Sequence, residues 1–209
     1  MFDDYLRRHL DGPLVRFATL IDRPWVTADR LTAAGLILGL GSAAAAAATW
    51  WWLSLALWLI SRLADGLDGP VARLRRCRDP DRSDAGAGGF FDITADFLVY
   101  GSTVVGVSVG ANTAYGAPWW PFLLVLLAYY VNGTAFLAFS SIAERSRRTL
   151  DDGRSLSFLG GLAEGAETIV VHGLWLIFSA VAWQIALVWA VVVSISAVHR
   201  MVVGYRSLR

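Results

Sequence analysis

Residues 53–73 read LSLALWLISRLADGLDGPVAR, an apolar run that ends in two aspartates and an arginine. As a helix, this run is long enough to cross the roughly 30 Å hydrocarbon core of a bilayer. At about 1.5 Å per residue, Asp65 lies roughly 18 Å beyond Leu53, which is still at membrane depth, and Asp68 follows one turn later. Ionisable groups at this depth are costly and usually functional. The stretch therefore predicts a transmembrane helix that carries a polar site near one membrane surface.

The rest of the chain agrees with a membrane protein. Hydrophobic residues make up 56% of its 209 residues, and the mean hydropathy is +0.52. Apart from an Ala43–Ala48 run, which is expected to allow close helix packing, we find no low-complexity tract. Six apolar windows have spanning length: Thr32–Trp52, Leu53–Arg73, Phe90–Ala111, Trp119–Ala143, Phe158–Ala182 and Trp183–Val203. We therefore predict an all-α, polytopic membrane protein whose residues 31–209 form a six-helix transmembrane domain.

Charge is unevenly distributed between the two sides of these spans. The junctions near Trp50 and Trp183 and the loop Asn112–Pro118 carry no formal charge, whereas the arginines lie in or near the other connections and the tails. The positive-inside rule places such arginines in the cytoplasm. We therefore expect a bacterial-type cytoplasmic (inner) membrane protein with both termini and the polar site on the cytoplasmic side.

Residues 1–30 precede the first span and mix apolar with charged side chains. The apolar ones recur near helical spacing, and charges interrupt any signal-peptide core, so an interfacial amphipathic helix on the cytoplasmic leaflet is expected. Gly12-Pro13 is expected to break this helix. The apolar positions before the break are Phe2, Tyr5, Leu6 and Leu10.

The third span returns towards the far side of the membrane and carries two more aspartates near its start. Asp92 and Asp96 lie at a depth comparable to that of Asp65 and Asp68. Spacings of three and four residues place both members of each pair on one helix face. Four carboxylates are therefore expected to converge between two helices.

Four buried carboxylates need positive charge beside them, because an uncompensated buried charge costs several kcal/mol. Oxygen ligands favour magnesium, manganese or calcium, and the absence of a nearby histidine or cysteine disfavours zinc. Two divalent ions would balance four acids and suit displacement at phosphorus. The alternative is a set of structural ion pairs with Arg62 and Arg73, which leaves two acids unmatched.

The motif around these acids is specific. Asp65-Gly66-Leu67-Asp68-Gly69-Pro70-Val71-Ala72-Arg73, followed by Gly88, Asp92 and Asp96, resembles the signature of the CDP-alcohol phosphatidyltransferase family. The spacing within each half matches the family pattern, and six spans with cytoplasmic termini are similar to that family as well. One departure is the segment between Arg73 and Gly88, which is longer than usual and looks like a cytoplasmic loop extension over the site.

The resemblance implies an enzyme that transfers the phosphatidyl group of CDP-diacylglycerol to an alcohol and releases CMP. It implies that Asp65, Asp68, Asp92 and Asp96 hold two magnesium or manganese ions, with Asp96 also acting as the base. It further implies a homodimer among membrane lipids, without nucleic acid. The residues it places at the nucleotide are Asp65, Gly66, Gly69, Ala72 and Arg73.

Candidate acceptor-binding residues lie in the loop before the fifth span and at the start of that span. The arginines of this loop could hold a phosphate or only signal topology. Glu164 and Glu167 share a helix face and either pair with these arginines or bind acceptor hydroxyls. His172 is expected to be an interior histidine, and Asn132, Ser140 and Ser141 are expected to bond between helices. The candidate arginines are Arg145, Arg147, Arg148 and Arg154.

Several acceptors and functions are compatible with this pattern. A polyol phosphate such as glycerol 3-phosphate or inositol phosphate is favoured. Phosphatidylglycerol, as in a cardiolipin-type synthase, comes next, and serine, choline or inositol follows. A membrane cation or proton carrier is disfavoured because the acids cluster at one depth, and a noncatalytic scaffold is disfavoured because all four acids are present.

Overall fold

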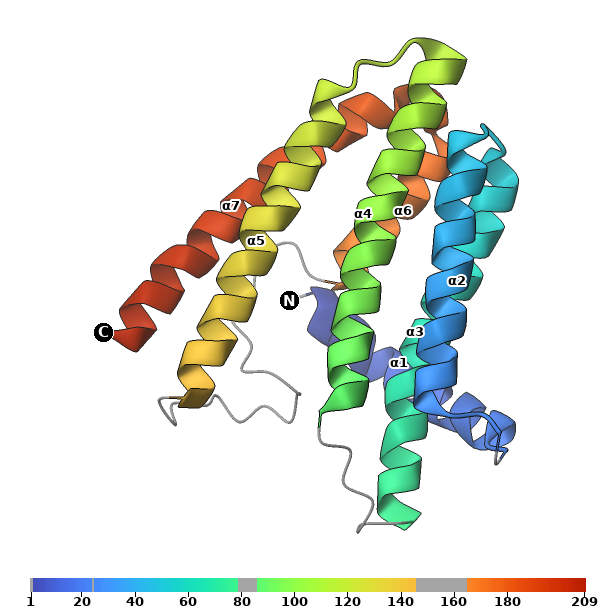
Figure 1. Cartoon of the computed structure of the whole chain (residues 1–209), viewed down its shortest axis with the longest axis vertical. Coiled ribbons are helices and arrows are strands. Elements are labelled where there is room, and N and C mark those ends of the chain that lie inside the picture. The colour runs from blue at the N-terminus through green and yellow to red at the C-terminus, as the bar shows by residue number, and fades with distance from the viewer. Residues whose placement is uncertain (1, 24, 79–85, 146–164) are drawn as a thin grey trace.

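A computed structural model shows an all-α protein (Figure 1). It describes residues 2–23, 25–78, 86–145 and 165–209, with side chains from Gly12 onwards and without those of residues 144 and 145. Residues 79–85 of the predicted loop extension and Arg147, Arg148, Arg154 and Glu164 lie outside the described residues. Residues 74–78 and 87, which were predicted to belong to that loop, are helical. The helices are α1 (Phe2–Ile21), α2 (Ala28–Ala47), α3 (Trp51–Arg78), α4 (Ala87–Tyr115), α5 (Trp120–Arg145), α6 (Gly165–Ile177) and α7 (Ala182–Leu208), with a 3₁₀ turn at Ser179–Val181.

The helices form two groups. Helix α2 packs against both α3 and α4, whereas α5 packs along α7, and α6 contacts α3, α4 and α7. Large buried side chains from these elements join the groups into one core, among them Trp58, Phe122, Trp175 and Trp189. The acids on α3 and α4 are thus positioned through their shared neighbour α2.

Helices α2 and α4 approach each other through small residues. A Cβ added at Gly106 would collide with the backbone of Ala43, and one added at Gly110 would collide with the carbonyl of Ala46. Small residues at such crossings let membrane helices pack backbone to backbone. The expected role of the Ala43–Ala48 run is confirmed for these two alanines.

Four of the described helical segments are long and apolar enough to cross a membrane: Ala28–Ala47, Ala87–Tyr115, Trp120–Ala143 and Ser179–Leu208. Helix α3 has 28 residues, which is ample length, but its charged second half lowers its hydropathy. Helix α6 has 13 described residues, and the start of the predicted fifth span at Phe158 lies outside the described part. The protein is therefore an all-α membrane protein with four apolar helices of spanning length among the described residues.

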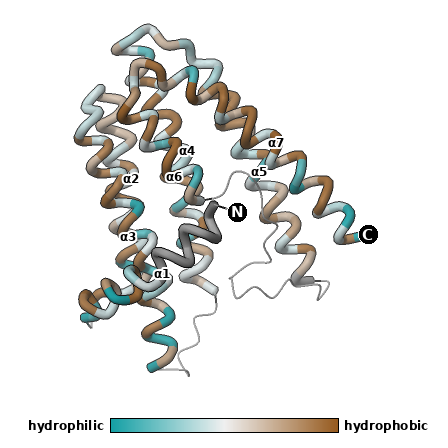
Figure 2. The backbone as a smooth tube through the Cα atoms, turned by 180° about the vertical axis from the view of Figure 1, so that it is seen from behind, coloured by the Kyte–Doolittle hydropathy of each residue, from teal (hydrophilic) through white to brown (hydrophobic). Residues whose placement is uncertain are grey.

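Helix α1 is continuous, so the predicted break at Gly12-Pro13 is wrong. A proline inside a helix removes one N–H donor, and here the helix continues through that loss. Beyond the proline, Ala18 is buried against Leu67 and Val71 of α3. This contact anchors α1 across the end of the bundle at which α3 ends, as Figure 2 shows from behind.

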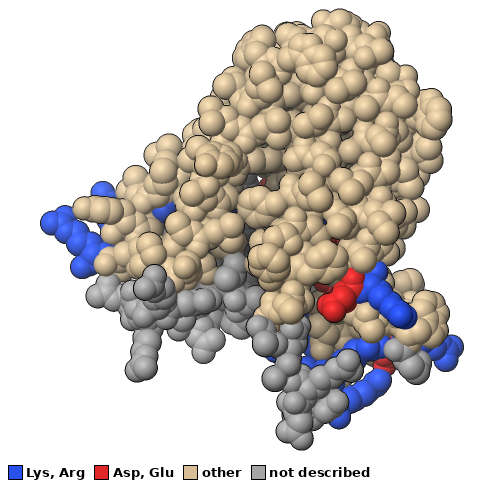
Figure 3. Space-filling model, viewed as in Figure 1, with Lys and Arg blue, Asp and Glu red and all other residues tan. Residues whose placement is uncertain are grey.

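Charged side chains gather at this same end. In the view of Figure 3 the upper part of the molecule shows no charged side chain, and the arginines and acids lie below, near the start of α2, the end of α3 and the end of α7. The last turn of α3 alone carries Arg75, Arg76 and Arg78. The described charges are thus sorted along the bundle axis.

Candidate active site

Three carboxylates meet between α3 and α4. Asp65 and Asp68 lie one turn apart on α3, and Asp92 lies in the second turn of α4. Each offers an oxygen, and these oxygens all lie within 4.8 Å of one another. Hard oxygen donors at this separation fit a divalent cation of the magnesium type. The group could therefore hold a metal ion.

A third helix fixes one member of this group. Thr32 of α2 donates from its hydroxyl to Oδ2 of Asp68 at 2.6 Å, and both residues are buried. The bond holds the carboxylate while leaving its other oxygen for a ligand. Sequence reasoning did not identify Thr32, because nothing in its spacing marks it as a neighbour of Asp68.

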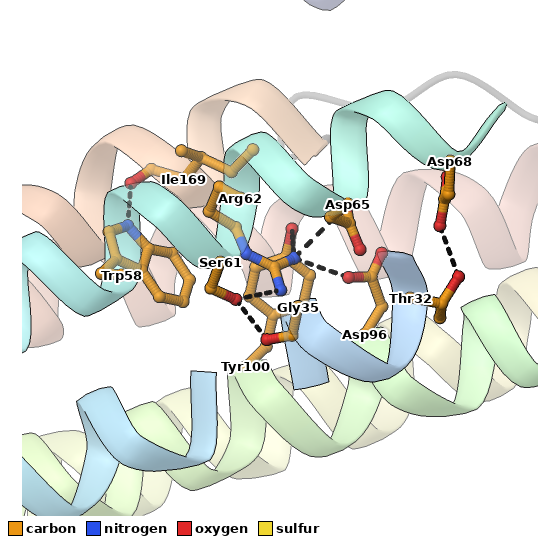
Figure 4. A network of polar contacts seen from close by, with 10 residues as sticks. All are labelled: Thr32, Gly35, Trp58, Ser61, Arg62, Asp65, Asp68, Asp96, Tyr100 and Ile169. Carbon is orange, nitrogen blue, oxygen red and sulfur yellow. Dashed lines mark hydrogen bonds and ion pairs between the residues drawn. The ribbon is translucent and has the colours of Figure 1, made fainter. Parts of the chain in front are cut away.

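Asp96 lies beside an arginine and outside the three-carboxylate group. Nη1 of Arg62 donates to Oδ1 of Asp96 at 2.6 Å and is 3.5 Å from Oδ2 of Asp65 (Figure 4). The alternative of structural ion pairs is thus realised in part, through Arg62. Arg73 is exposed. Among the described residues, the ion pairs that Asp65 and Asp96 make are with Arg62.

A cavity of about 440 Å³ opens beside Asp96, between α4, α5, α6 and α7. One wall of the cavity carries a buried positive charge, the side chain of Arg200 on α7, which is 6% exposed. Arg200 donates to Oδ1 of Asn132 at 3.2 Å, and its guanidinium lies 5.6 Å from the ring centre of Phe136. The cavity therefore joins a carboxylate on one wall to an arginine on another.

Comparison with known protein families matches residues 25–196 to CDP-alcohol phosphatidyltransferase. The chain belongs to this family. The matched region contains all of α3 and α4, and hence all four aspartates. A curated relative is the inner membrane protein YnjF of Escherichia coli (strain K12), which is 33% identical over 186 residues, or 86% of this chain and 84% of the relative. The protein is thus a membrane enzyme of this family.

In this CDP-alcohol phosphatidyltransferase, the residues predicted at the nucleotide lie on α3 beside the acids. A Cβ added at Gly66 would meet no neighbouring atom within 4 Å, and one added at Gly69 would lie 3.4 Å from Nη1 of Arg73. Ala72 is half-buried and Arg73 is exposed. This face of α3 therefore offers open space next to a guanidinium, and its contact with a nucleotide stays a prediction.

The residues predicted at the acceptor are described only in part. The side chain of Arg145 lies outside the described part of the chain, as do Arg147, Arg148, Arg154 and Glu164. Glu167 is half-buried, and its Oε2 has no hydrogen-bond partner among the described residues. Its role at an acceptor stays a prediction.

The polar residues expected in the interior differ in outcome. His172 is fully buried, with Nε2 2.9 Å from the hydroxyl of Tyr129, so the expectation of an interior histidine is confirmed. Asn132 bonds between α5 and α7 as expected. The hydroxyl of Ser140 has no partner among the described residues, and Ser141 is exposed, so their expected role as interhelical bonds is not seen.

Proposed function

We propose that the enzyme transfers the phosphatidyl group of CDP-diacylglycerol to an alcohol with release of CMP. The observation that carries this proposal is the convergence of Asp65, Asp68 and Asp92 within 4.8 Å, on the motif of the family to which the chain belongs. A cavity lined by Asp96 adjoins this group, so a metal-held diphosphate and an acceptor alcohol have adjacent places.

The donor set fits magnesium or manganese, since every nearby ligand is a carboxylate. We propose that Asp65, Asp68, Asp92 and Asp96 hold two such ions. When bound, these ions would offset the negative charge on the diphosphate and on the attacking and leaving oxygens. Arg73, exposed on the same helix, contacts the nucleotide phosphates, and Gly66, Gly69 and Ala72 leave room for the nucleotide to approach.

Asp96 is proposed as the base, because it faces both the acid cluster and the cavity. Its carboxylate takes the proton of the acceptor hydroxyl as the oxygen forms a bond to the phosphorus of the phosphatidyl group. The bond between that phosphorus and the bridging oxygen breaks, and the electron pair leaves with CMP. The remaining contribution of the protein is to hold the reactants in line.

The favoured acceptor is a polyol phosphate such as glycerol 3-phosphate or inositol phosphate. The buried guanidinium of Arg200 supports this, because arginine suits paired hydrogen bonds to phosphate oxygens, and the cavity has a volume typical of small-molecule sites. We keep the arginines and glutamates of the preceding loop as further proposed acceptor ligands: Arg145, Arg147, Arg148, Arg154, Glu164 and Glu167.

A second candidate acceptor is phosphatidylglycerol, which would make the enzyme a cardiolipin-type synthase. The same cavity is lined by Phe97, Tyr130 and Leu137, which are all exposed on the outside of the bundle. Such a lining opens towards lipid and suits an acceptor that carries acyl chains. A small alcohol without a phosphate would have no group for the guanidinium of Arg200 to bind.

We further propose the membrane arrangement and the assembly. Helices α2 to α7 are proposed as six transmembrane helices, with α1 on the cytoplasmic leaflet and both termini and the acid cluster on the cytoplasmic side of an inner membrane. The sorting of charge along the bundle supports this orientation (Figure 3). The active form is proposed to be a homodimer, which cross-linking in native membranes tests.

The proposed function is tested by an acceptor panel. Purified protein is given CDP-diacylglycerol, magnesium and one acceptor at a time: glycerol 3-phosphate, inositol phosphate, phosphatidylglycerol, serine, choline or inositol. We expect CMP release with a polyol phosphate, and its loss when a chelator is in excess over magnesium. Turnover that persists in excess chelator contradicts the metal site, and no CMP release with any acceptor contradicts the reaction.

A further inference from the structure

Arg62 is a buried cation placed next to the residue proposed as the base. It lies on α3 one turn before Asp65, and it is 7% exposed. Its short bond to Asp96 and its 3.5 Å contact with Asp65 compensate its charge. The family motif begins at Asp65, so Arg62 stands outside the residues to which a role has been proposed above.

The guanidinium is held by more than these acids. Nη2 donates to the hydroxyl of Ser61 at 3.0 Å, and Ser61 in turn donates to the carbonyl of Gly35 on α2 at 2.6 Å. The guanidinium carbon also lies 5.2 Å from the ring centre of Trp58 and 5.1 Å from that of Tyr100. Cation–π contacts at these distances favour a fixed position for an arginine.

The aromatic neighbours extend this support to the other helices, as Figure 4 shows in part. Trp58 donates from Nε1 to the carbonyl of Ile169 on α6 at 3.2 Å, and its ring stacks on His172 at 5.0 Å. Tyr100 lies one turn after Asp96 on α4, and its hydroxyl is 3.4 Å from Nη1 of Arg62. Arg62 is therefore fixed by contacts that reach α2, α4 and α6.

The consequence falls on Asp96. Its Oδ1 accepts a hydrogen bond from Arg62. Both Asp96 and Tyr100 line the cavity of about 440 Å³ that is proposed to bind the acceptor (the acceptor cavity). Because one of its oxygens accepts a hydrogen bond from a fixed donor, the carboxylate of Asp96 cannot rotate freely about its side-chain bonds and keeps one orientation. The other oxygen then remains for the proposed metal ion and for the proton of the acceptor hydroxyl.

We propose that Arg62 is a positioning residue that orients the carboxylate of Asp96 towards the acceptor cavity. The proposal rests on the proposed function, in which Asp96 takes the acceptor proton. It requires the planar fork of arginine, because Nη1 and Nη2 bond Asp96 and Ser61 at the same time, and the single ammonium of lysine cannot reproduce that geometry. Charge compensation alone would accept either residue.

The test compares R62Q and R62K with the exposed control R206Q, using CMP release with the best acceptor of the panel. We expect kcat to fall about 100-fold in R62Q, the cost of misplacing a reacting group by about 1 Å, with KM for CDP-diacylglycerol changed less than about threefold. R62K is expected to keep less than a tenth of wild-type kcat. R206Q is expected to match wild type.

Two further measurements separate positioning from other roles. Manganese binding followed by electron paramagnetic resonance is expected to persist in R62Q, because Asp65, Asp68 and Asp92 remain; loss of manganese binding in step with kcat overturns the proposal. Wild-type kcat in folded R62Q or in R62K also overturns it. If R62Q does not fold, R62K decides the question. If wild type turns over and the Arg62 variants have the same kcat, only the positioning role is refuted. If wild type itself shows no turnover, the proposed function is refuted.

Discussion

At the scale of single residues, Asp96 differs from the other three acids in its surroundings. Asp65, Asp68 and Asp92 face one another, whereas Asp96 is divided between Arg62 and the acceptor cavity. Three acids that converge suit metal binding, and one that faces a cavity suits proton transfer. The difference predicts that substitutions within the cluster have different effects.

We predict that Asp96→Asn abolishes CMP release while the protein stays folded. The amide keeps the shape of the carboxylate but cannot accept the acceptor proton, and loss of a positioned base typically lowers the rate by about 10²–10⁴-fold. CMP release measures the activity, and thermal unfolding in detergent measures the fold. Asp29→Asn, in the exposed first turn of α2, is the control and is expected to turn over normally. Normal turnover in Asp96→Asn would remove this residue from the mechanism.

Residue spacing predicted that four acids converge; three of them do, whereas Asp96 lies beside Arg62. Arg62 was predicted as a possible ion-pair partner, but Thr32 was not. Helical periodicity indicates which face of a helix a carboxylate occupies. Because the two spans run in opposite directions, their acids were expected at the same depth, where those of α3 and α4 could meet. The rotamer of Arg62 and the packing of Thr32 depend on helix α2, whose crossing angle no local spacing encodes. Arg200 was missed because one arginine near the end of the last span looks like a topology signal.

At the scale of helices, the site depends on how closely α4 approaches α2. Gly106 and Gly110 lie directly against the backbone of Ala43 and Ala46. This contact sets the position of α4 and, with it, the positions of Asp92 and Asp96 relative to α3. The packing of small residues far from the acids is therefore part of the geometry of the site.

We predict that Gly106→Ala lowers the thermal stability of the protein in detergent. The added methyl group collides with the backbone of Ala43, and overpacking of this kind costs about 1–3 kcal/mol. Gly173→Ala on α6 is the matched control, since a Cβ there meets no atom within 4 Å. In the control, the better helix propensity of alanine is expected to leave stability equal or slightly raised. Equal melting temperatures for the two variants would contradict the tight α2–α4 contact.

Hydropathy predicted the apolar helices well and their ends less well. Helix α3 continues to Arg78 and α7 to Leu208, beyond the windows that ended at Arg73 and Val203. Hydropathy reports contact with lipid, whereas a helix continues into water for as long as its backbone hydrogen bonds and charged side chains allow. Helix α1 likewise continues through Pro13 because one missing donor does not end a helix.

At the scale of the whole molecule, the two helix groups divide the proposed chemistry. The α2–α3–α4 group carries all four aspartates and Arg62, and the α5–α7 pair carries Asn132 and Arg200 of the cavity. Helix α6 joins them through His172, which stacks on Trp58 and bonds Tyr129. CDP-diacylglycerol bound by the α2–α3–α4 group and an acceptor alcohol bound by the α5–α7 pair would meet at Asp96.

The orientation of the molecule can be tested with its own single cysteine. Cys77 is exposed in the last turn of α3, next to Arg76 and Arg78, at the charged end of the bundle. The positive-inside rule places this end in the cytoplasm, so a membrane-impermeant maleimide is expected to label Cys77 in inside-out vesicles and not in intact spheroplasts. A gel shift after maleimide-polymer labelling measures this.

The matched control moves the thiol to the opposite end. In the double variant Cys77→Ser/Thr113→Cys, the thiol lies near the end of α4, in an exposed position beside the uncharged loop. Its labelling pattern is expected to be the reverse, with modification in intact spheroplasts. If Cys77 reacts in intact spheroplasts while the thiol at position 113 is protected, the molecule has the opposite orientation. The acid cluster then faces away from the cytoplasm, where the headgroups of the CDP-linked substrate are expected. Because the proposed reaction releases CMP into the cytoplasm, that single result would contradict both the orientation and the reaction in the cell.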